Sequence, residues 1–522
     1  MAKRKKFRGV LTALYLLFVS GVFVLFPFTS NAELQCSDVL GFTIPDTTIL
    51  SAVPVGPLGS VPAYCKVEGY VETRALRGEP NNQVNFRVGL PSTWNGKFYF
   101  QGIGGLAGSI PSIDFGLVRG YASAGTDTGH QGGPFDAQWA YNNRTKEIDF
   151  GYRAIHVVTV AAKAITSKFY GNVPLFSYFN GCSNGGRQGL IEANQYPDDY
   201  DGIVVGSPVT DHIGFMLAFS WDSRAVLRSI DNFIPISKLP LISSAVLDTC
   251  DGEDGLVDGL VSDPGGCSFD PASLQCPDGI APDCLSAGQV DSLTKIYAGP
   301  TTSKGKEIYP GIPKGHEDAG GWQPWIVSFG ENPVVQPDGT LLFGAPQYGF
   351  VSQEGFLRYL AFPVDNPDYD WRSFNFDKDT PKTSSMASIL SVSTNLAAFR
   401  HRGGKIVMYH GWSDTCLSPF RTVDYFLQVQ RASGGEERTA EFLRLFMVPG
   451  MLHCAGGPGP NVFDALGALE QWVEQGIAPD YLVASGGTPY RTRPLCPYPQ
   501  VAVYDEQCGD IDSADCFQCQ EH

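Results

Sequence analysis

Residues 180–186, with the sequence NGCSNGG, decide the fold of this chain. The apolar run at 174–179 precedes them and predicts a buried strand, and residues 187–194 predict the start of a helix. A serine between glycines at a strand-to-helix turn fits the G-x-S-x-G nucleophile elbow, because small flanking residues permit the strained turn that exposes Ser183. A glycine-rich turn without chemistry fits the same residues, so the rest of the chain must decide.

Length and charge narrow the class of protein. The chain has 522 residues, 43% of them hydrophobic, which is enough to bury a large core in more than one structural unit. Residues 1–8 carry five basic side chains, an apolar run follows at 10–28, and small residues follow at 30–32. We interpret 1–32 as a secretory signal peptide, with an uncleaved membrane anchor as the alternative. Its removal takes the net charge from −17 to −22, which argues against a nucleic-acid partner.

Thirteen cysteines in a chain with a secretory signal indicate an oxidising compartment, several disulfides and one unpaired thiol. Three pairs are close enough in sequence to be bridged locally: Cys36 with Cys65, Cys250 with Cys267, and Cys276 with Cys284. The sequence does not assign the pairing of five others, which are Cys416, Cys496, Cys508, Cys516 and Cys519.

Several apolar segments are spaced as the strands of one sheet. Residues 84–90 alternate as a half-buried strand, and 97–100 and 121–130 predict two more. An amphipathic helix is predicted over 152–169, and a further strand lies within 199–206. This order predicts an α/β protein with a parallel sheet and Ser183 at the end of a strand.

A glycine-rich loop at 101–105 follows an early predicted strand. In an α/β hydrolase such a loop supplies the second N–H of the oxyanion hole, while the residue after the serine supplies the first. Asn184 is therefore one candidate donor, and Gly104 or Gly105 is the other. The alternative is an ordinary turn.

Two late strands are each followed by a polar residue that a serine hydrolase needs. Residues 404–410 predict a strand that leads to Asp414, and 442–448 predict one that leads to His453. The order serine, aspartate, histidine is that of the α/β-hydrolase fold, so the candidate triad is Ser183, Asp414 and His453. His410 is the alternative base. Two earlier histidines are interpreted as structural, His130 and His156.

The segment 211–391 differs in composition from the rest of the chain, because Trp, Pro, Gly and Cys are frequent in it. Its apolar residues also show only weak strand and helix periodicity. We interpret it as a lid domain inserted into a catalytic domain formed by 33–210 and 392–522. Within it, residues 250–260 alternate carboxylates with turn glycines. Such a loop suits calcium, which prefers oxygen ligands, and suits a solvated acidic turn equally well.

One detail makes the hydrolase interpretation specific: Cys182 immediately precedes the candidate serine, and Cys454 immediately follows the candidate histidine. With these pairs the chain resembles the tannase and feruloyl esterase family over nearly its whole mature length. Three further motifs carry the resemblance: HCAGGPGP at 453–460, FDAL at 463–466 and FLRYLAF at 356–362.

The resemblance implies an α/β-hydrolase fold with a large inserted lid domain and a disulfide between Cys182 and Cys454. It also implies a structural Ca²⁺ in the acidic loop, held by three carboxylates and two backbone carbonyls. The carboxylates would come from Asp251, Asp254 and Asp258, and the carbonyls from Leu256 and Leu260.

In function, the resemblance implies a secreted serine esterase, extracellular or periplasmic, which is free of the membrane once the signal is removed. Its substrate would be a small aromatic ester, such as a feruloyl or galloyl ester, free or attached to plant polysaccharide or tannin. The alternatives are a hydrolase of a terephthalate monoester, a serine carboxypeptidase and an inactive hydrolase fold used for binding. The last would be expected to lack a triad residue, and all three are present.

Overall fold

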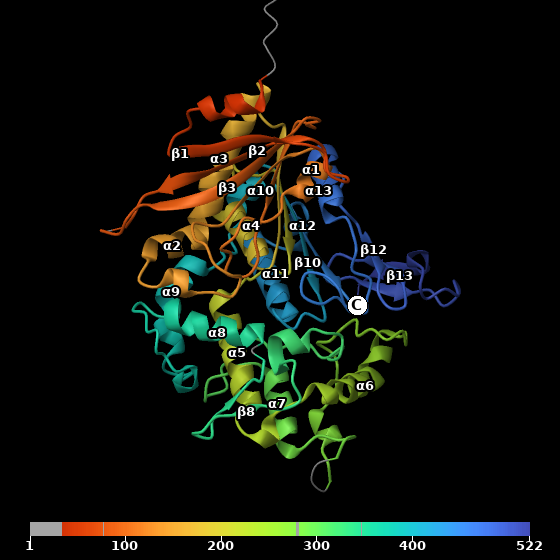
Figure 1. Ribbon diagram of the computed structural model, residues 1–522. Coiled ribbons are helices and arrows are strands. Elements are labelled where there is room, and N and C mark those ends of the chain that lie inside the picture. The colour runs from red at the N-terminus through yellow and green to blue at the C-terminus, as the bar shows by residue number, and fades with distance from the viewer. Residues whose placement is uncertain (1–33, 77, 278–280, 346, 522) are drawn as a thin grey trace, which may run out of the picture. The chain divides into compact units, whose positions relative to one another are not determined.

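A nine-stranded sheet runs through the part of the chain that the computed structural model describes, residues 34–521 except 77, 278–280 and 346 (Figure 1). The predicted signal peptide lies outside these residues. Contacts join Cys36–His522 into one compact unit. Among the described residues, no helix is both long and apolar enough to cross a bilayer.

The strands of the sheet lie, in spatial order, as β1 (Thr47–Val55), β2 (Tyr64–Thr73), β3 (Asn82–Pro91), β5 (Ala122–Thr126), β4 (Lys97–Gln101), β6 (Phe176–Cys182), β7 (Gly202–Gly206), β10 (Lys405–Gly411) and β11 (Leu443–Val448). The first three strands and the β3–β5 pair are antiparallel. From β5 to β11 every neighbouring pair is parallel. The carboxyl ends of the six parallel strands therefore meet at one edge of the sheet.

The α-helices are α1 (Asp114–Val118), α2 (Arg144–Ile148), α3 (Ala154–Tyr170), α4 (Asn184–Gln195), α5 (His212–Val226), α6 (Leu239–Cys250), α7 (Ala287–Ala298), α8 (Tyr348–Tyr359), α9 (Ser384–Leu390), α10 (Ala397–His401), α11 (Pro419–Ser433), α12 (Glu436–Ala440) and α13 (Ala465–Gln475). Three small hairpins lie outside the sheet, β8 (Val334–Val335) with β9 (Leu341–Leu342), β12 (Leu482–Gly486) with β13 (Arg491–Leu495), and β14 (Val501–Tyr504) with β15 (Phe517–Gln520).

Helices cover both faces of the sheet. Successive strand side chains point to opposite faces, so Phe98 and Phe100 of β4 enter one hydrophobic cluster while Tyr99 enters another. The first cluster includes apolar residues of α3, α4 and α11, and the second includes the apolar face of α13. The parallel strands are buried on both faces, which explains why they read as nearly continuous apolar runs in the sequence.

Most of the predicted sheet is present at the expected positions, but its first two strands, β1 and β2, were not predicted. The stretch between Cys36 and Cys65, which is rich in Val, Pro and Gly, forms β1. The strand is irregular, because its register shifts between Ile49 and Ser51, and it contains Pro54. A proline fits there because β1 is an edge strand of the sheet.

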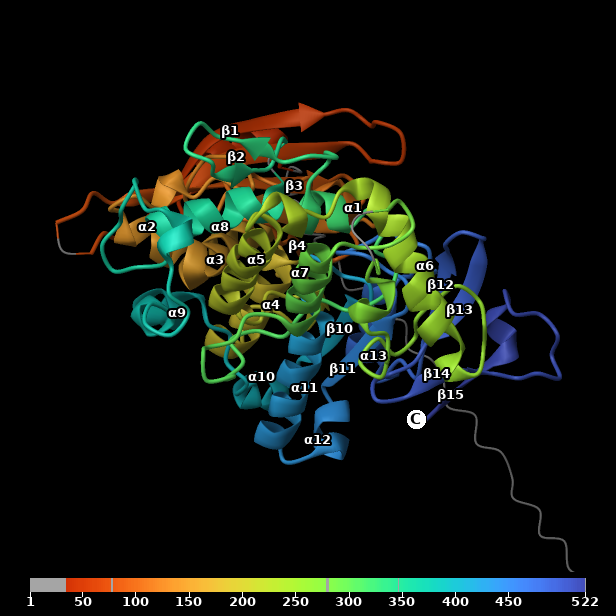
Figure 2. The same cartoon turned by 90° about the horizontal axis from the view of Figure 1, so that it is seen from below.

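The chain between β7 and β10 adds no strand to the sheet among its described residues. It contains α5 to α10 and a third hydrophobic cluster. In Figure 1 and in the turned view of Figure 2, the labelled helices α5, α7 and α8 lie together on one side of this unit. The boundaries 211–391 of the lid domain remain a prediction.

Candidate active site

The turn between β6 and α4 holds Ser183 in a strained conformation, with φ 63° and ψ −126°. Non-glycine residues rarely adopt a positive φ, and such strain concentrates at functional sites. The turn is tight enough to require its glycines. A Cβ on Gly181 would lie 2.5 Å from the backbone of Gly185, and one on Gly186 would lie 2.7 Å from the carbonyl oxygen of Gly206. The NGCSNGG stretch therefore has the backbone of a nucleophile elbow.

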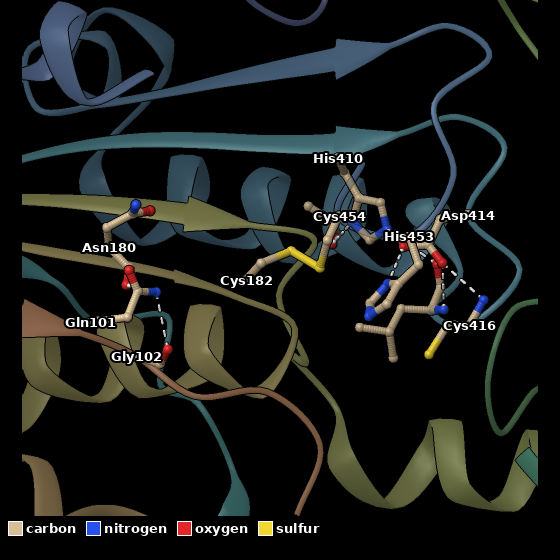
Figure 3. Close-up of a disulfide and its surroundings, with 11 residues drawn as sticks. Gln101, Gly102, Asn180, Cys182, His410, Asp414, Cys416, His453 and Cys454 are labelled. Carbon is tan, nitrogen blue, oxygen red and sulfur yellow. Dashed lines mark hydrogen bonds and ion pairs between the residues drawn. A yellow bond between two sulfur atoms is a disulfide. The ribbon is translucent and has the colours of Figure 1, made fainter. Parts of the chain in front are cut away.

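Asp414 and His453 lie in the loops that follow β10 and β11, and they are hydrogen-bonded. His453 Nδ1 donates to Asp414 Oδ2 at 2.7 Å. The other carboxylate oxygen accepts the backbone N–H groups of Cys416 and Leu417, at 2.8 and 3.0 Å. Figure 3 shows His453 beside Asp414 at the ends of these strands. The carboxylate is thus fixed in place to orient the imidazole.

His410, the alternative base in the sequence, is fully buried on β10. Its Nε2 donates to Asp414 Oδ2 at 3.0 Å, and its Nδ1 lies 2.8 Å from the hydroxyl of Thr422. The side chain does not line the cavity that contains Ser183. This geometry fits a residue that positions Asp414 better than it fits a general base.

The aspartate and the histidine shift each other's pKa. Burial alone would raise the pKa of Asp414, but the charge of His453 and the hydrogen bonds from His410 and His453 hold it well below its usual range. Burial alone would lower the pKa of His453, but the Asp414 carboxylate, with a smaller contribution from Cys416, raises it well above 6.5. Asp414 therefore stabilises the imidazolium that forms when His453 accepts a proton.

A disulfide joins the two candidate catalytic loops (Figure 3). Cys182 and Cys454 are bonded, with an S–S distance of 2.02 Å and a Cα–Cα distance of 6.0 Å. Because these cysteines are the immediate neighbours of Ser183 and His453, the bond limits how far the two residues can separate. The resemblance implied this pairing, and the structure contains it.

The described residues contain six disulfides and one free, buried cysteine, Cys416. The three local pairs expected from the sequence are present. Two further bridges pin the C-terminal hairpins, and the sequence had left them unassigned: Cys496 with Cys519, and Cys508 with Cys516.

The candidate oxyanion donors lie on either side of the serine. Asn184 is the first residue of α4, so its N–H is one that an α-helix leaves without an internal partner. Gly104 lies against the nucleophile, because a Cβ there would be 3.8 Å from Ser183 Cβ. Gly105 has φ 59°, and a Cβ on it would lie 2.5 Å from the carbonyl oxygen of Pro134. Of the two glycines, Gly104 is the better placed.

Arg187 was not predicted and supports the elbow from inside. It is fully buried, and its Nε donates to the side-chain oxygen of Asn184 at 2.7 Å. The amide of Asn184 in turn donates to the carbonyl of Ile103 at 3.1 Å. The remaining guanidinium nitrogens donate to the carbonyls of Phe150 and Gly151. This chain of bonds ties the start of α4 to the glycine loop.

A cavity of about 270 Å³ opens in front of the serine. It is lined by Gly104, Gly105, Leu106, Pro134, Phe135, Ser183, Asn184, Val209, His212, Phe215, Met216, Phe219, Trp325, Ser352, Cys416, His453 and Cys454. The wall opposite the sheet comes from α5, α8 and the turn that holds Trp325. A larger hollow of about 640 Å³, near Trp221, contains none of the predicted site residues.

Aromatic rings form much of the cavity wall. Phe219 stacks on Trp325 at a centroid distance of 5.9 Å, and Phe135 meets Trp325 edge-on at 6.0 Å. Trp325 also meets the ring of His453 edge-on at 5.8 Å. The sequence did not identify these residues, because they lie in segments without a motif. Such a wall suits a flat aromatic group beside the nucleophile.

His212 is the unexpected polar residue of this cavity. Its ring is 2% exposed, and neither ring nitrogen has a hydrogen-bond partner among the described residues. Burial, with a smaller effect from Arg187, holds its pKa well below 6.5, so the ring is neutral. A neutral imidazole can donate one hydrogen bond and accept another.

The acidic loop in the insertion is folded around Asp251. Its carboxylate accepts the N–H groups of Asp258, Gly259 and Leu260, at 2.9 to 3.2 Å. Among the described residues, Asp254 accepts one hydrogen bond, from the N–H of Leu256 at 2.9 Å. Burial raises the pKa of Asp258, and the charges of Asp251 and Asp254 raise it further. Carboxylate oxygens are the ligand type that calcium prefers.

Two arginines already neutralise part of this loop. Asp258 Oδ2 accepts from Arg491 Nη1 at 2.9 Å and from Arg493 Nη2 at 2.6 Å. Asp258 therefore has a structural role with or without a metal. The described carboxylates of the loop do not converge to within 4.8 Å as a group of three.

Comparisons with known proteins identify the family of this chain. The family model for "Tannase and feruloyl esterase" matches residues 65–520. An uncharacterised esterase of Xanthomonas campestris pv. campestris is 35% identical, with 94% of this chain and 92% of that protein aligned. Mono(2-hydroxyethyl) terephthalate hydrolase of Piscinibacter sakaiensis is 34% identical, over 88% and 85% of the two chains.

Among solved structures, feruloyl esterase B from Aspergillus oryzae superposes with a TM-score of 0.80 at 26% identity. The match covers 93% of this chain and 99% of that one. Together with the order of the parallel strands, this similarity confirms the predicted α/β-hydrolase fold.

Proposed function

This chain belongs to the tannase and feruloyl esterase family of carboxylic ester hydrolases, and we propose that it cleaves esters of phenolic carboxylic acids with Ser183 as nucleophile. The observation that carries the proposal is the aromatic cavity, which Ser183 and His453 line together. His453 is bonded to Asp414 through Nδ1, and its ring also interacts with the thiol of Cys416. Ser183 and His453 line one cavity and Asp414 bonds to His453, which supports assigning these three residues as the triad.

In the proposed reaction, His453 removes the proton of Ser183 as the serine oxygen attacks the ester carbonyl. The N–H groups of Asn184 and Gly104 stabilise the oxyanion, and His453 then protonates the departing alcohol. A water molecule, activated by the same imidazole, attacks the acyl-enzyme and releases the acid. Asp414 stays ionised throughout, because its pKa is held low.

The cavity also favours one substrate class over others. Its lining contains no lysine or arginine among the described residues. A terephthalate monoester and a peptide C-terminus each present a carboxylate, which this lining would leave without a cationic partner. A phenolic acid presents neutral hydroxyl groups instead, and the free nitrogens of His212 are suited to bind one. Feruloyl or galloyl esters, free or attached to polysaccharide or tannin, are therefore the preferred substrates.

A substrate panel tests this assignment. Methyl ferulate and methyl gallate should be cleaved with kcat/KM at least about tenfold above that of a terephthalate monoester, because leaving a charge unpaired costs more than 1.4 kcal/mol. A blocked peptide should not be cleaved. Dimethyl terephthalate, with both acids esterified, has the same ring without the charge and serves as the control. A preference for the charged monoester would overturn the substrate assignment and leave the esterase assignment intact.

We also propose that the chain is secreted and carries a structural calcium ion in the loop 251–260. Six disulfides support an oxidising compartment. The donor set supports calcium, with carboxylates of Asp251, Asp254 and Asp258 and the carbonyls of Leu256 and Leu260 as ligands. When bound, the ion would neutralise the loop, and none of these residues lines the cavity.

Chelation should lower the melting temperature while leaving kcat unchanged at temperatures where the chain stays folded. Calcium present at 100 times its Kd contributes about 2.7 kcal/mol, and chelation removes this. Asp254→Asn should abolish the sensitivity to chelator, measured by calorimetry with and without EDTA. Asp254 is the variant of choice because, unlike Asp258, it forms no ion pair with an arginine in the part of the chain that the structure describes.

Asp263→Asn is the matched control, because Asp263 also accepts the N–H two residues further on, from Gly265 at 3.0 Å. This variant should keep the full response to EDTA. Equal melting temperatures with and without chelator in the native chain would contradict the calcium assignment.

A further inference from the structure

A second group of polar side chains lies away from the active-site cavity, on the helices behind the nucleophile. His156 comes from α3, Glu192 from α4, and Asp199 from the segment that leads into β7. Each offers one nitrogen or oxygen, and these atoms lie within 4.8 Å of one another. Among the described residues no other set of three His, Cys, Asp or Glu side chains converges in this way. None of the three lines the cavity at Ser183.

Glu192 is the residue that the fold leaves unexplained. It is 1% exposed, and, while it is ionised, neither of its carboxylate oxygens accepts a hydrogen bond from a donor among the described residues. The carboxylate of Asp199 lies beside it, and both would be charged at neutral pH in water. Burying one carboxylate against another without a cation is costly. Burial, the charge of Asp199 and, in the protonated form, a hydrogen bond shared with the Asp199 side chain raise the pKa of Glu192 well above its usual range.

The nearest fixed cation does not resolve this conflict. The amine of Lys163 donates to the backbone carbonyl of Asp199, not to a carboxylate. No ion pair joins Lys163 to Glu192 in the described part of the chain. Burial lowers the pKa of Lys163, despite the nearby charge of Asp199. Asp199 pairs with His156 at 2.6 Å, whereas Glu192 forms no ion pair among the described residues.

We propose that His156, Glu192 and Asp199 bind one divalent transition-metal ion, of which zinc is the first candidate. One imidazole and two carboxylates form a donor set that zinc and similar ions accept, whereas calcium prefers oxygen ligands alone. The side chains of His156 and Asp199 are 32% and 12% exposed, so water can reach a fourth position. The ion bonds to one oxygen of Glu192 and offsets the charge of its carboxylate.

Binding requires only a small rearrangement. His156 Nδ1 and Asp199 Oδ2 now share a hydrogen bond of 2.6 Å. Two ligand atoms that each lie about 2.1 Å from a tetrahedral zinc are about 3.4 Å apart. The distance between His156 Nδ1 and Asp199 Oδ2 would therefore increase by less than about 1 Å. The ring of His156 stacks on Tyr196 at 3.9 Å, which leaves room for this motion within the ring plane. The ion would tie α3 and α4 to the strand entry and support the helix that begins after Ser183.

Cobalt(II) is the probe, because it replaces zinc and absorbs visible light when bound by nitrogen and oxygen ligands. The whole enzyme, kept in calcium so that the acidic loop is saturated, is titrated with Co²⁺. One equivalent should bind and produce a visible absorption band. Glu192→Gln and His156→Asn should each weaken binding by about 100-fold or more, beyond the loss typical of outer-shell changes. Esterase activity reports that each variant is folded.

Asp198→Asn is the matched control. Asp198 adjoins the cluster in sequence, but its side chain is 94% exposed and pairs with Arg402. It should bind Co²⁺ as the native enzyme does. Anomalous scattering from a crystal soaked in Co²⁺ should place the ion within bonding distance of Glu192. Absence of stoichiometric uptake, or a band that survives both Glu192→Gln and His156→Asn, would overturn the proposal.

Discussion

Ser183→Ala should lower kcat by about 10⁴- to 10⁶-fold on every ester that the enzyme accepts. This loss is expected when the nucleophile of a triad is removed, since the oxyanion hole and binding contribute only the residual rate. The strained turn at Ser183 directs its hydroxyl into the cavity, and alanine removes only the oxygen. The free energy of unfolding should not fall, because the main-chain conformation is set by the surrounding glycines.

Ser352→Ala is the matched control, because Ser352 lines the same cavity without belonging to the triad. Its effect on kcat should stay within about tenfold, as for a side chain that does not bond to the reacting carbon. A fluorophosphonate should label Ser183 in the native enzyme, with the site identified by peptide mass spectrometry. A label on Ser352, or full activity in Ser183→Ala, would show that the nucleophile had been assigned wrongly.

Asp414→Asn should lower kcat by about 10⁴-fold and also move its pH dependence. The general base must be neutral, so activity falls as the pH drops through the pKa of His453. Asp414 raises that pKa above 6.5, so the acidic limb in the native enzyme should have its midpoint above that value. Without the carboxylate the imidazole is easier to deprotonate, and the limb should move to lower pH.

The measurement is kcat/KM from pH 4 to pH 9 for the native chain, for Asp414→Asn and for a control. Asp424→Asn serves as the control, because Asp424 lies near Asp414 in sequence but has an exposed side chain (52%). Its ion pair is with Arg421, at 3.9 Å, and not with a histidine of the site. This variant should leave both rate and profile unchanged. An identical acidic limb in Asp414→Asn and the native chain would mean that another group sets the pH dependence.

The sequence predicted the parallel half of the sheet because parallel strands are buried on both faces. Their apolar runs end in glycine or polar turns, so strand positions and chain order could be inferred together. The same order placed Ser183, Asp414 and His453 at neighbouring strand ends. The elbow was recognisable because its glycines are required by contacts with backbone, which leave no room for a Cβ.

The helix α5, the cavity wall and the isolated Glu192 could not be predicted from the sequence. Helix α5 buries 12 of its 15 residues, so it has no polar face to give a helical period. Trp325 and His212 line the cavity only after the insertion folds over the strand ends, and no local pattern marks either of them. Glu192 lies on a helix predicted from the sequence, but its lack of a partner is a property of three packed segments. Such features arise from tertiary contacts alone.

The disulfide between Cys182 and Cys454 has a topological consequence. It spans 272 positions and closes the chain into a covalent ring that contains Ser183, Asp414, His453 and the entire insertion. If a protease cuts the chain once between Ser183 and His453, the two fragments stay linked through this disulfide. The nucleophile and its base then lie on separate peptides of one molecule, and the covalent link between them is lost only on reduction. The surface loops of the insertion are therefore free to be long, because cleaving one of them does not by itself release either catalytic loop.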